Sequence, residues 1–397
     1  DDKFIVGRLT SFYGGNTYYF IVYKIFRDIR LVGTPPSSIG KFGADTDNWM
    51  WPRHTGDFSI FRVYADKDNN PADYSEDNVP YSPERHLRIS LAGYEEGSPA
   101  MIMGYPGTTN RFMTASELAE QRERNEVAIK VRTVRQDVLM ADMQADPKIM
   151  IQYASKYAGS SNGWKKWIGM NETFAKLGVQ DRRAEEEVAF TEWVNAGGQE
   201  RIDRYGDALK NIDEAVAGRK ADNLLAAYLR ESLGSIELVN VSAYGGMIKE
   251  ALDKKDQEKK DAELASIEAA LENFYKDYSM PTDKKVAVAM ISLLKESIPA
   301  EELPSFYQEI DSCFGGDINA FVEDLYSKSL YTSLDKVKAA VDAADVSALT
   351  DDPACKVLLS YIKSYNPHQQ ALIEYAEQFA QGKKDYIAGT LEMREGE

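Results

Sequence analysis

Proline and glycine are spread very unevenly along the chain, and this pattern constrains the fold more than any other feature of the sequence. Residues 1–110 contain eight of the 14 prolines and 11 of the 27 glycines in a chain of 397 residues. Proline interrupts helices because it lacks a backbone donor, and glycine favours turns. A chain of this length also exceeds the usual size of one core. We therefore expect two domains, a β-rich one over residues 1–110 and an α-helical one over residues 111–397.

Short strand-like segments fill the first region. Residues 17–26 (TYYFIVYKIF) are aromatic and β-branched, and residues 58–66 (FSIFRVYAD) alternate between apolar and polar side chains. LRISLA (87–92) and SPAMIMGYP (98–106) have the same character and are bounded by glycine or proline. Several short strands separated by turn signals are typical of a barrel or a sandwich.

Helical signals fill the second region. Thr114-Ala-Ser-Glu117 is a capping-box pattern, and a helical run follows it to about residue 146. Further helical patterns occupy residues 171–195, 198–232, 250–279, 284–296, 301–311, 315–345 and 354–383. Charged residues separate apolar ones at helical spacing, so we expect antiparallel helices packed as several hairpins.

The charge and the apolar runs exclude some functions. A formal net charge of −17 repels phosphate backbones, so we predict no nucleic-acid partner. No apolar run approaches the roughly 18 residues that a membrane helix needs, and we predict no membrane span. The chain begins without methionine or a signal peptide. We expect a processed or excised piece, so the missing signal says nothing about the compartment.

Metal and nucleotide chemistry have little support in the sequence. The three histidines form no metal-binding motif, and the two cysteines, Cys313 and Cys355, are too few for a cysteine-rich zinc site. One disulfide between them remains open. Asp45-x-Asp47 begins like a calcium loop, but Trp49 stands where a third oxygen ligand belongs. No phosphate-binding glycine motif occurs. We predict no metal and no cofactor.

Residues 45–66 (DTDNWMWPRHTGDFSIFRVYAD) form the most distinctive segment. His54, Asp57 and Ser59 are the residue types of a catalytic triad, but a triad needs side chains that converge from separate elements. Asp57 alone could orient a histidine from another strand, because it precedes a strand-like run, or it could simply cap the turn of HTGD. Trp49 and Trp51 could be core aromatics.

A longer stretch around this segment, residues 35–66, closely resembles the bacterial dipeptidyl peptidase 7 and 11 family. YKIFRDIRLVG (23–33), GYPGTTNRF (104–112) and YASKYAGSSNGWKKWIGM (153–170) fit this family as well, so the resemblance covers essentially the whole chain. These enzymes are serine exopeptidases with a chymotrypsin-like double β-barrel and a large inserted helical domain. The resemblance therefore implies an α+β fold, with part of the double barrel followed by an all-α lid domain.

Site residues follow from the resemblance by position. Asp57 resembles the triad aspartate, Asn48 and Trp49 resemble residues that line the subsite for the free N-terminus of the substrate, and Asn162 resembles the asparagine that reaches the same amino group. An ammonium group has three N–H donors, which asparagine oxygens can accept, and the indole of Trp49 can face the cation. Without the family, Asn162 in AGSSNG is a plain turn residue.

The sequence departs from the family in two places. No histidine precedes His54, and no GxSG-type nucleophile segment occurs. The resemblance therefore implies the middle of a serine-type dipeptidyl aminopeptidase, which releases dipeptides from oligopeptides with a free N-terminus. We expect this chain alone to be inactive, and we expect the residue that selects acidic or apolar substrates to lie outside it.

The family also implies a homodimer exported to the periplasm or the cell surface. The alternative function is a non-catalytic helical module on a β platform, which would bind peptides or act as a scaffold.

Overall fold

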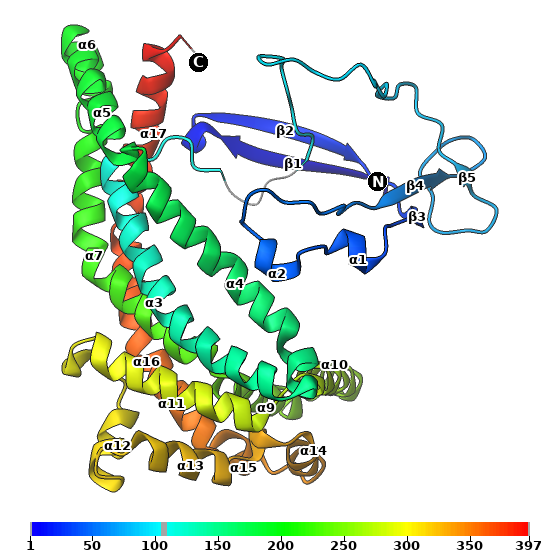
Figure 1. The fold of residues 1–397 in the computed structure, drawn as a ribbon, viewed down its shortest axis with the longest axis vertical. Helices are drawn as coiled ribbons and strands as arrows, with labels where there is room; N and C mark the ends of the chain where they lie inside the picture. The colour runs from blue at the N-terminus through cyan, green and yellow to red at the C-terminus, as the bar shows by residue number, and fades with distance from the viewer. Residues whose placement is uncertain (1, 105–108, 396–397) are drawn as a thin grey trace. The chain divides into compact units, whose positions relative to one another are not determined.

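The chain forms two compact units in the computed structural model, which describes residues 2–104 and 109–395 (Figure 1). The first unit comprises Asp1–Met113, Glu192–Tyr205 and Lys383–Glu397, and the second comprises Thr114–Thr191 and Gly206–Gly382. We call the second the helical unit. The described part of residues 2–113 is called the β region. The domain boundary at residue 110 stays a prediction. The structure groups the segments Glu192–Tyr205 and Lys383–Glu397 with the N-terminal residues, whereas the prediction assigned both segments to the helical domain.

Two small antiparallel sheets form the β region. Strand β1 (Ile5–Phe12) pairs with β2 (Thr17–Lys24), and Ile5 lies opposite Lys24. The second sheet has the order β3-β4-β5, with the bounds Asp28–Gly33, Ile60–Ala65 and Val79–Pro80. The strands predicted in residues 17–26 and 58–66 are therefore confirmed.

The other two predicted strands, residues 87–92 and 98–106, are wrong for every residue that the structure describes; residues 105 and 106 lie outside that part. Leu91 is 97% exposed and has no neighbouring strand. The hydrogen bonds of a strand are made to another strand, so an apolar alternation without a partner cannot form one. Neither of the two sheets seen in the described residues closes into a barrel.

Apolar side chains of the β region remain largely in contact with solvent. Ala65 is the only fully apolar residue that is buried among the described residues of this region. Large side chains on both sheets, such as Leu9, Phe20 and Leu31, are more than half exposed. The two sheets therefore bury no core of their own.

The helical elements account for most of the chain. The helical unit contains α3 (Ala115–Ala145), α4 (Pro147–Lys176), α7 (Ala208–Ser232), α8 (Glu237–Val241), α9 (Tyr244–Leu252), α10 (Gln257–Lys276), α11 (Met280–Ser297), α12 (Phe306–Cys313), α13 (Ile318–Lys328), α14 (Leu334–Asp342), α15 (Val346–Thr350) and α16 (Pro353–Glu374). The first unit contains α1 (Ser37–Gly40), α2 (Ala44–Asp47) and α6 (Gly198–Tyr205), while α5 (Val179–Ala196) and α17 (Ala376–Met393) contribute residues to both units.

Long helices pack side by side in the helical unit. Helix α3 lies against α4, α7 and α11, and α7 also lies against α16 (Figure 1). Thr114 caps α3 as predicted, because its hydroxyl accepts from the N–H of Glu117 and the Glu117 carboxylate accepts from the N–H of Thr114.

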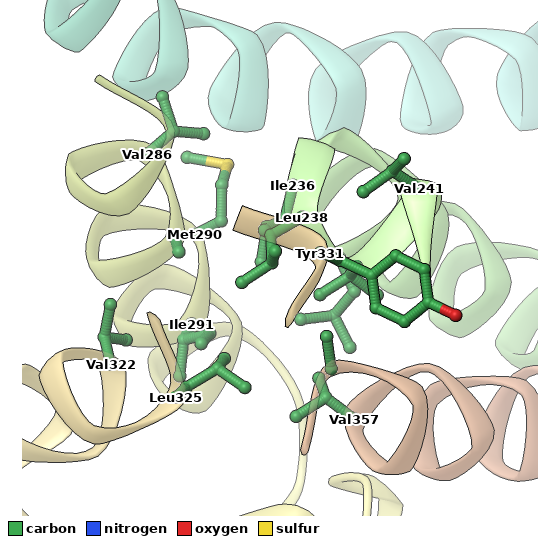
Figure 2. Close-up of a cluster of buried hydrophobic side chains, with 14 of the residues drawn as sticks. Ile236, Leu238, Val241, Val286, Met290, Ile291, Val322, Leu325, Tyr331 and Val357 are labelled. Atoms are coloured by element: carbon green, nitrogen blue, oxygen red, sulfur yellow. The ribbon is translucent and has the colours of Figure 1, made fainter. Parts of the chain in front are cut away.

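A single large apolar core holds these helices together. Figure 2 shows side chains from several helices converging in it, among them Leu238, Met290, Ile291 and Tyr331, all fully buried. The hydroxyl of Tyr331 donates to the carbonyl of Leu349 at 2.7 Å, so this ring is buried without an unsatisfied donor. The helical unit thus supplies its own core.

One predicted helix, residues 315–345, is divided in the structure into α13 and α14. The carboxylate of Asp352 accepts from the Ser329 hydroxyl and from the Leu330 N–H, both at 2.8 Å, and this fixes the break between the helices. The predicted helix at 250–279 begins later, as α10, where Asp256 accepts from the N–H of Lys259.

Helix α4 is the main element that the sequence analysis missed. The turn expected at AGSSNG is wrong, because α4 continues through it from Pro147 to Lys176. Asp146 caps the helix by accepting from the Lys148 N–H, and Pro147 occupies the first turn. Each glycine inside a helix costs about 1 kcal/mol relative to alanine, so packing of α4 against α3 must offset Gly159 and Gly163.

Two further points of the sequence analysis concern a disulfide between the cysteines and a helix that could span a membrane. Cys313 is exposed, Cys355 is buried, and both are free thiols, so no disulfide joins them. Within the described residues, none of the helices combines the length and the apolar character that crossing a membrane requires.

Candidate active-site segment

The segment between β3 and β4 contains three of the predicted site residues and folds back on itself. The hydroxyl of Thr55 donates to the carbonyl of Phe42 at 2.9 Å, and the N–H of Gly56 donates to the carbonyl of Ile39 at 3.1 Å. These two bonds close a loop around α2 and the residues that follow it. Asn48 and Trp49 therefore lie inside this closed loop, and Asp57 follows it directly.

Asn48 ends helix α2 and is half-buried. Its N–H donates to the carbonyl of Asp45 at 3.2 Å, and its side-chain oxygen accepts from Nη1 of Arg53 at 3.4 Å. Arg53 also donates from Nε to the Thr55 hydroxyl at 3.1 Å. Arg53 thus connects the asparagine to the bonds that close the loop.

Trp49 has a backbone that this residue type rarely adopts. Its φ angle is 62°, in the left-handed region, directly after the end of α2, where glycine is the usual residue. The side chain is 55% exposed, and that of Trp51 is 93% exposed. Neither tryptophan is a core aromatic in this chain. A left-handed tryptophan costs roughly 1–2 kcal/mol, and such strain concentrates at functional sites.

Asp57 lies three residues before β4 and is exposed. Its carboxylate forms no hydrogen bond or ion pair with any residue that the structure describes, so Asp57 does not cap the HTGD turn. The same holds among His54, Asp57 and Ser59, which are not joined by any hydrogen bond between described atoms. Asp57 is thus a hydrogen-bond acceptor just before strand β4, and no described residue donates a hydrogen bond to its carboxylate.

Asn162 lies in the helical unit and not in the first unit. It stands in the middle of α4, between buried Ser161 and Gly163, and its own side chain is exposed. The helix rather than a turn determines where this side chain projects.

A buried carboxylate in the helical unit is an electrostatic feature that the sequence analysis did not identify. Asp283 accepts from the N–H groups of Glu237 and Leu238, each at 2.8 Å, and from the hydroxyl of Tyr326 at 2.7 Å. Burial, with the nearby charge of Glu237, raises the pKa of Asp283 to about 6. These bonds hold the N-terminus of α8, which is a structural role.

The described part of the chain contains no candidate metal site. No three or more histidine, cysteine, aspartate or glutamate side chains gather there in an arrangement that could hold an ion.

Comparison with known proteins identifies the family. The Peptidase S46 family model matches residues 2–397. The Asp/Glu-specific dipeptidyl-peptidase of Porphyromonas gingivalis is 41% identical over 390 residues, which are 97% of this chain and 54% of that protein. The dipeptidyl-peptidase 7 of Phocaeicola vulgatus is 40% identical over 394 residues, 98% of this chain and 54% of that protein.

Solved structures agree with these relatives. The crystal structure of Porphyromonas endodontalis DPP11 in complex with the dipeptide Arg-Glu matches with a TM-score of 0.84 and 39% identity, covering 99% of this chain and 56% of that chain. This chain spans about half the length of the curated relatives it matches. The resemblance read from residues 35–66 is confirmed, and the chain belongs to the Peptidase S46 family.

Proposed function

We propose that this chain is part of a serine-type dipeptidyl aminopeptidase, in which it supplies the triad aspartate and much of the subsite for the amino terminus of the substrate. One observation carries the proposal: in a member of the Peptidase S46 family, Asp57 is an exposed acceptor without a partner in the described chain, and the same β3–β4 segment contains a strained, exposed Trp49. The relatives described above are dipeptidyl-peptidases, which supports the reaction class.

The exposed apolar surface of the β region supports the fold that this proposal needs. Leu9, Phe20 and Leu31 would be buried if further strands covered the sheets. The first unit would then be part of a chymotrypsin-like double β-barrel, and the helical unit its inserted domain. The relatives are nearly twice as long as this chain. Their additional length is enough to supply such strands.

In the proposed mechanism, Asp57 accepts from Nδ1–H of a histidine outside this chain. It holds the imidazole in the tautomer that removes the proton of the serine nucleophile, and it stabilises the imidazolium that forms. A carboxylate that is already paired could not do this without losing its partner.

The amino terminus of the peptide needs a different set of groups. Asn48 and Asn162 offer amide oxygens to the ammonium, and the exposed indole of Trp49 offers its face. An ammonium buried without acceptors would cost several kcal/mol, so these groups would restrict the enzyme to peptides with a free N-terminus. Oligopeptides are the proposed substrates.

Family membership is also the basis for two further parts of the proposal. The protein would act in the periplasm or at the cell surface, and it would form a homodimer. Fractionation of the bacterial cell and light scattering of the purified full-length protein test these two points.

The central test is Asp57→Ala in the full-length enzyme. We expect kcat on a fluorogenic dipeptidyl substrate to fall by about 10⁴-fold, because the histidine loses its orientation. Asp68→Ala is a matched control, since Asp68 is an exposed aspartate in the turn after β4. The chain of 397 residues alone should release no fluorophore.

A kcat that stays within about threefold of wild type in Asp57→Ala would contradict the triad role. A full-length protein without any peptidase activity would instead favour the alternative, a non-catalytic peptide-binding or scaffold module.

A further inference from the structure

We infer that Arg132 is a positioning residue for recognition of the substrate's amino terminus, because its guanidinium fixes the turn of α4 that carries Asn162. The inference rests on the proposed function, since it extends the role proposed there for Asn162. Arg132 lies on α3 and would act through the backbone of α4.

The guanidinium of Arg132 joins three helices. Nε and Nη2 donate to the two carboxylate oxygens of Glu231 on α7, at 2.8 Å and 3.3 Å. Nη1 donates to the backbone carbonyl of Ser160 on α4, at 3.1 Å. Both side chains of the ion pair are mostly buried, with 22% and 10% of their surface exposed. A planar fork that bonds a carboxylate with one edge and a carbonyl with the other has little rotational freedom.

Gly163 explains how the guanidinium comes so close to the helix. A Cβ atom at this position would lie 3.0 Å from Nη1 of Arg132 and 3.3 Å from Cη2 of Trp167. Any side chain there would force the guanidinium or the ring to move. The glycine that made this segment read as a turn is therefore a site of close approach inside a helix.

The ring of Trp167 covers the guanidinium from the next turn of α4. Its centroid lies 4.6 Å from the central carbon of the Arg132 guanidinium, within the range of a cation–π contact. A second bond from α3 fastens the same helix, since Nε1 of Trp164 donates to the hydroxyl of Thr133 at 2.9 Å. Arg132 and Thr133 are adjacent, so one turn of α3 holds about two turns of α4.

The positions on the helix separate the fastened face from the face of Asn162. Ser160, Gly163 and Trp167 are three and four residues apart and share one face. Asn162 is two residues from Ser160, which is about 200° of rotation, and it is exposed. Fixing the inner face against Arg132 therefore fixes the direction in which Asn162 projects. A misplacement of about 1 Å can cost on the order of 100-fold in an enzymatic rate.

The test compares KM and kcat of full-length variants on a fluorogenic dipeptidyl substrate. Asn162→Ala should raise KM by about 10- to 100-fold, the effect of losing a hydrogen bond to a charged group. Arg132→Ala should raise KM by roughly tenfold and leave kcat within about threefold. The KM of the double variant should be no higher than that of Asn162→Ala, because both substitutions remove the same interaction.

Arg219→Ala is the matched control. Arg219 on α7 forms a similar two-bond ion pair with Glu120 on α3, at 2.8 Å and 2.6 Å, and it also lies over an aromatic ring, that of Phe379. Its loss should lower the melting temperature as Arg132→Ala does, but should leave KM unchanged. Arg132→Lys retains the charge beside Glu231 and covers the case in which the alanine variant does not fold. It should raise KM less than alanine does.

Several outcomes would overturn the inference. An equal rise of KM in Arg219→Ala would mean that general stability, and not position, is responsible. Effects of Arg132→Ala and Asn162→Ala that multiply in the double variant would mean that Arg132 acts independently of Asn162. A normal KM in Asn162→Ala alone would remove the proposed role of that residue and the inference with it, and this failure is visible in the single variant.

Discussion

Leu238, Met290 and Tyr331 of the helical unit are fully buried, whereas Leu91, Tyr94 and Ile102 of the β region are almost fully exposed. The residue types are similar, so hydrophobicity does not explain the contrast. A helix satisfies its backbone within itself and needs only another apolar stripe to pack against. A strand needs a neighbour before it exists at all. The helical unit therefore buries a core of its own, whereas the described β region buries almost no apolar surface.

The largest expected effect tests the two regions with the same substitution. Leu229 on α7 is fully buried, and Leu91 is 97% exposed. Leu229→Ala should lower the free energy of unfolding of this chain by about 2–5 kcal/mol, because it leaves a cavity in the core. Leu91→Ala should change it by less than about 0.5 kcal/mol. Urea unfolding followed by circular dichroism measures both; equal losses would show that the β region packs as well as the helical unit.

A smaller effect concerns the buried carboxyl group of Asp283 in the helical unit. The pKa of Asp283 is raised from 3.8 to about 6 because burial disfavours the carboxylate. The native state therefore binds a proton more tightly than the unfolded state. The stability contributed by the protonated form is fully present below about pH 4 and is lost as the pH rises through about 6, with a slope of at most about 1.4 kcal/mol per pH unit.

Asp283→Asn removes this titration. The advantage of wild type over the variant in free energy of unfolding should therefore shrink as the pH rises from about 4 to about 6, and stay constant above that range. Asp342→Asn, at an exposed position on α14, is the control and should show no such change. A difference between wild type and Asp283→Asn that is independent of pH would show that the carboxyl is not perturbed by its burial.

The smallest effect concerns a signal that is entirely local. Thr114→Ala removes the hydroxyl that caps α3 and should cost about 1 kcal/mol of unfolding free energy. Thr114→Ser keeps the oxygen and should cost much less. If the two variants lost equal stability in thermal unfolding, burial of the threonine methyl would matter more than the cap.

These local signals explain which parts of the fold could be predicted from the sequence. The capping box of Thr114 and the helical runs were readable because their information lies within a few residues. Helix α4 was missed because AGSSNG favours a turn locally, while Arg132, 28 residues from Ser160, favours the helix. Residues 87–92 have a strand pattern without a partner strand. In each case the deciding contact is distant in sequence.

The candidate site was less accessible to physical reasoning than the fold. Asp57 and Asn162 were predicted as site residues from the resemblance alone, since their local sequences favour a turn cap and a turn residue. Both local readings are wrong, because Asp57 caps nothing in the described chain and Asn162 is helical. The local sequence of neither residue indicates the role that is proposed for it.

Trp49 shows the same conflict within one residue. Its left-handed backbone after α2 is one that glycine adopts without cost, so Trp49→Gly should relax the main chain while it deletes the indole. Under the proposed role of Trp49, folding and substrate recognition would then respond to this one mutation in opposite directions. An evolving population selected only for stability would replace this tryptophan, and its persistence in a natural sequence would record selection for activity at the expense of thermal tolerance.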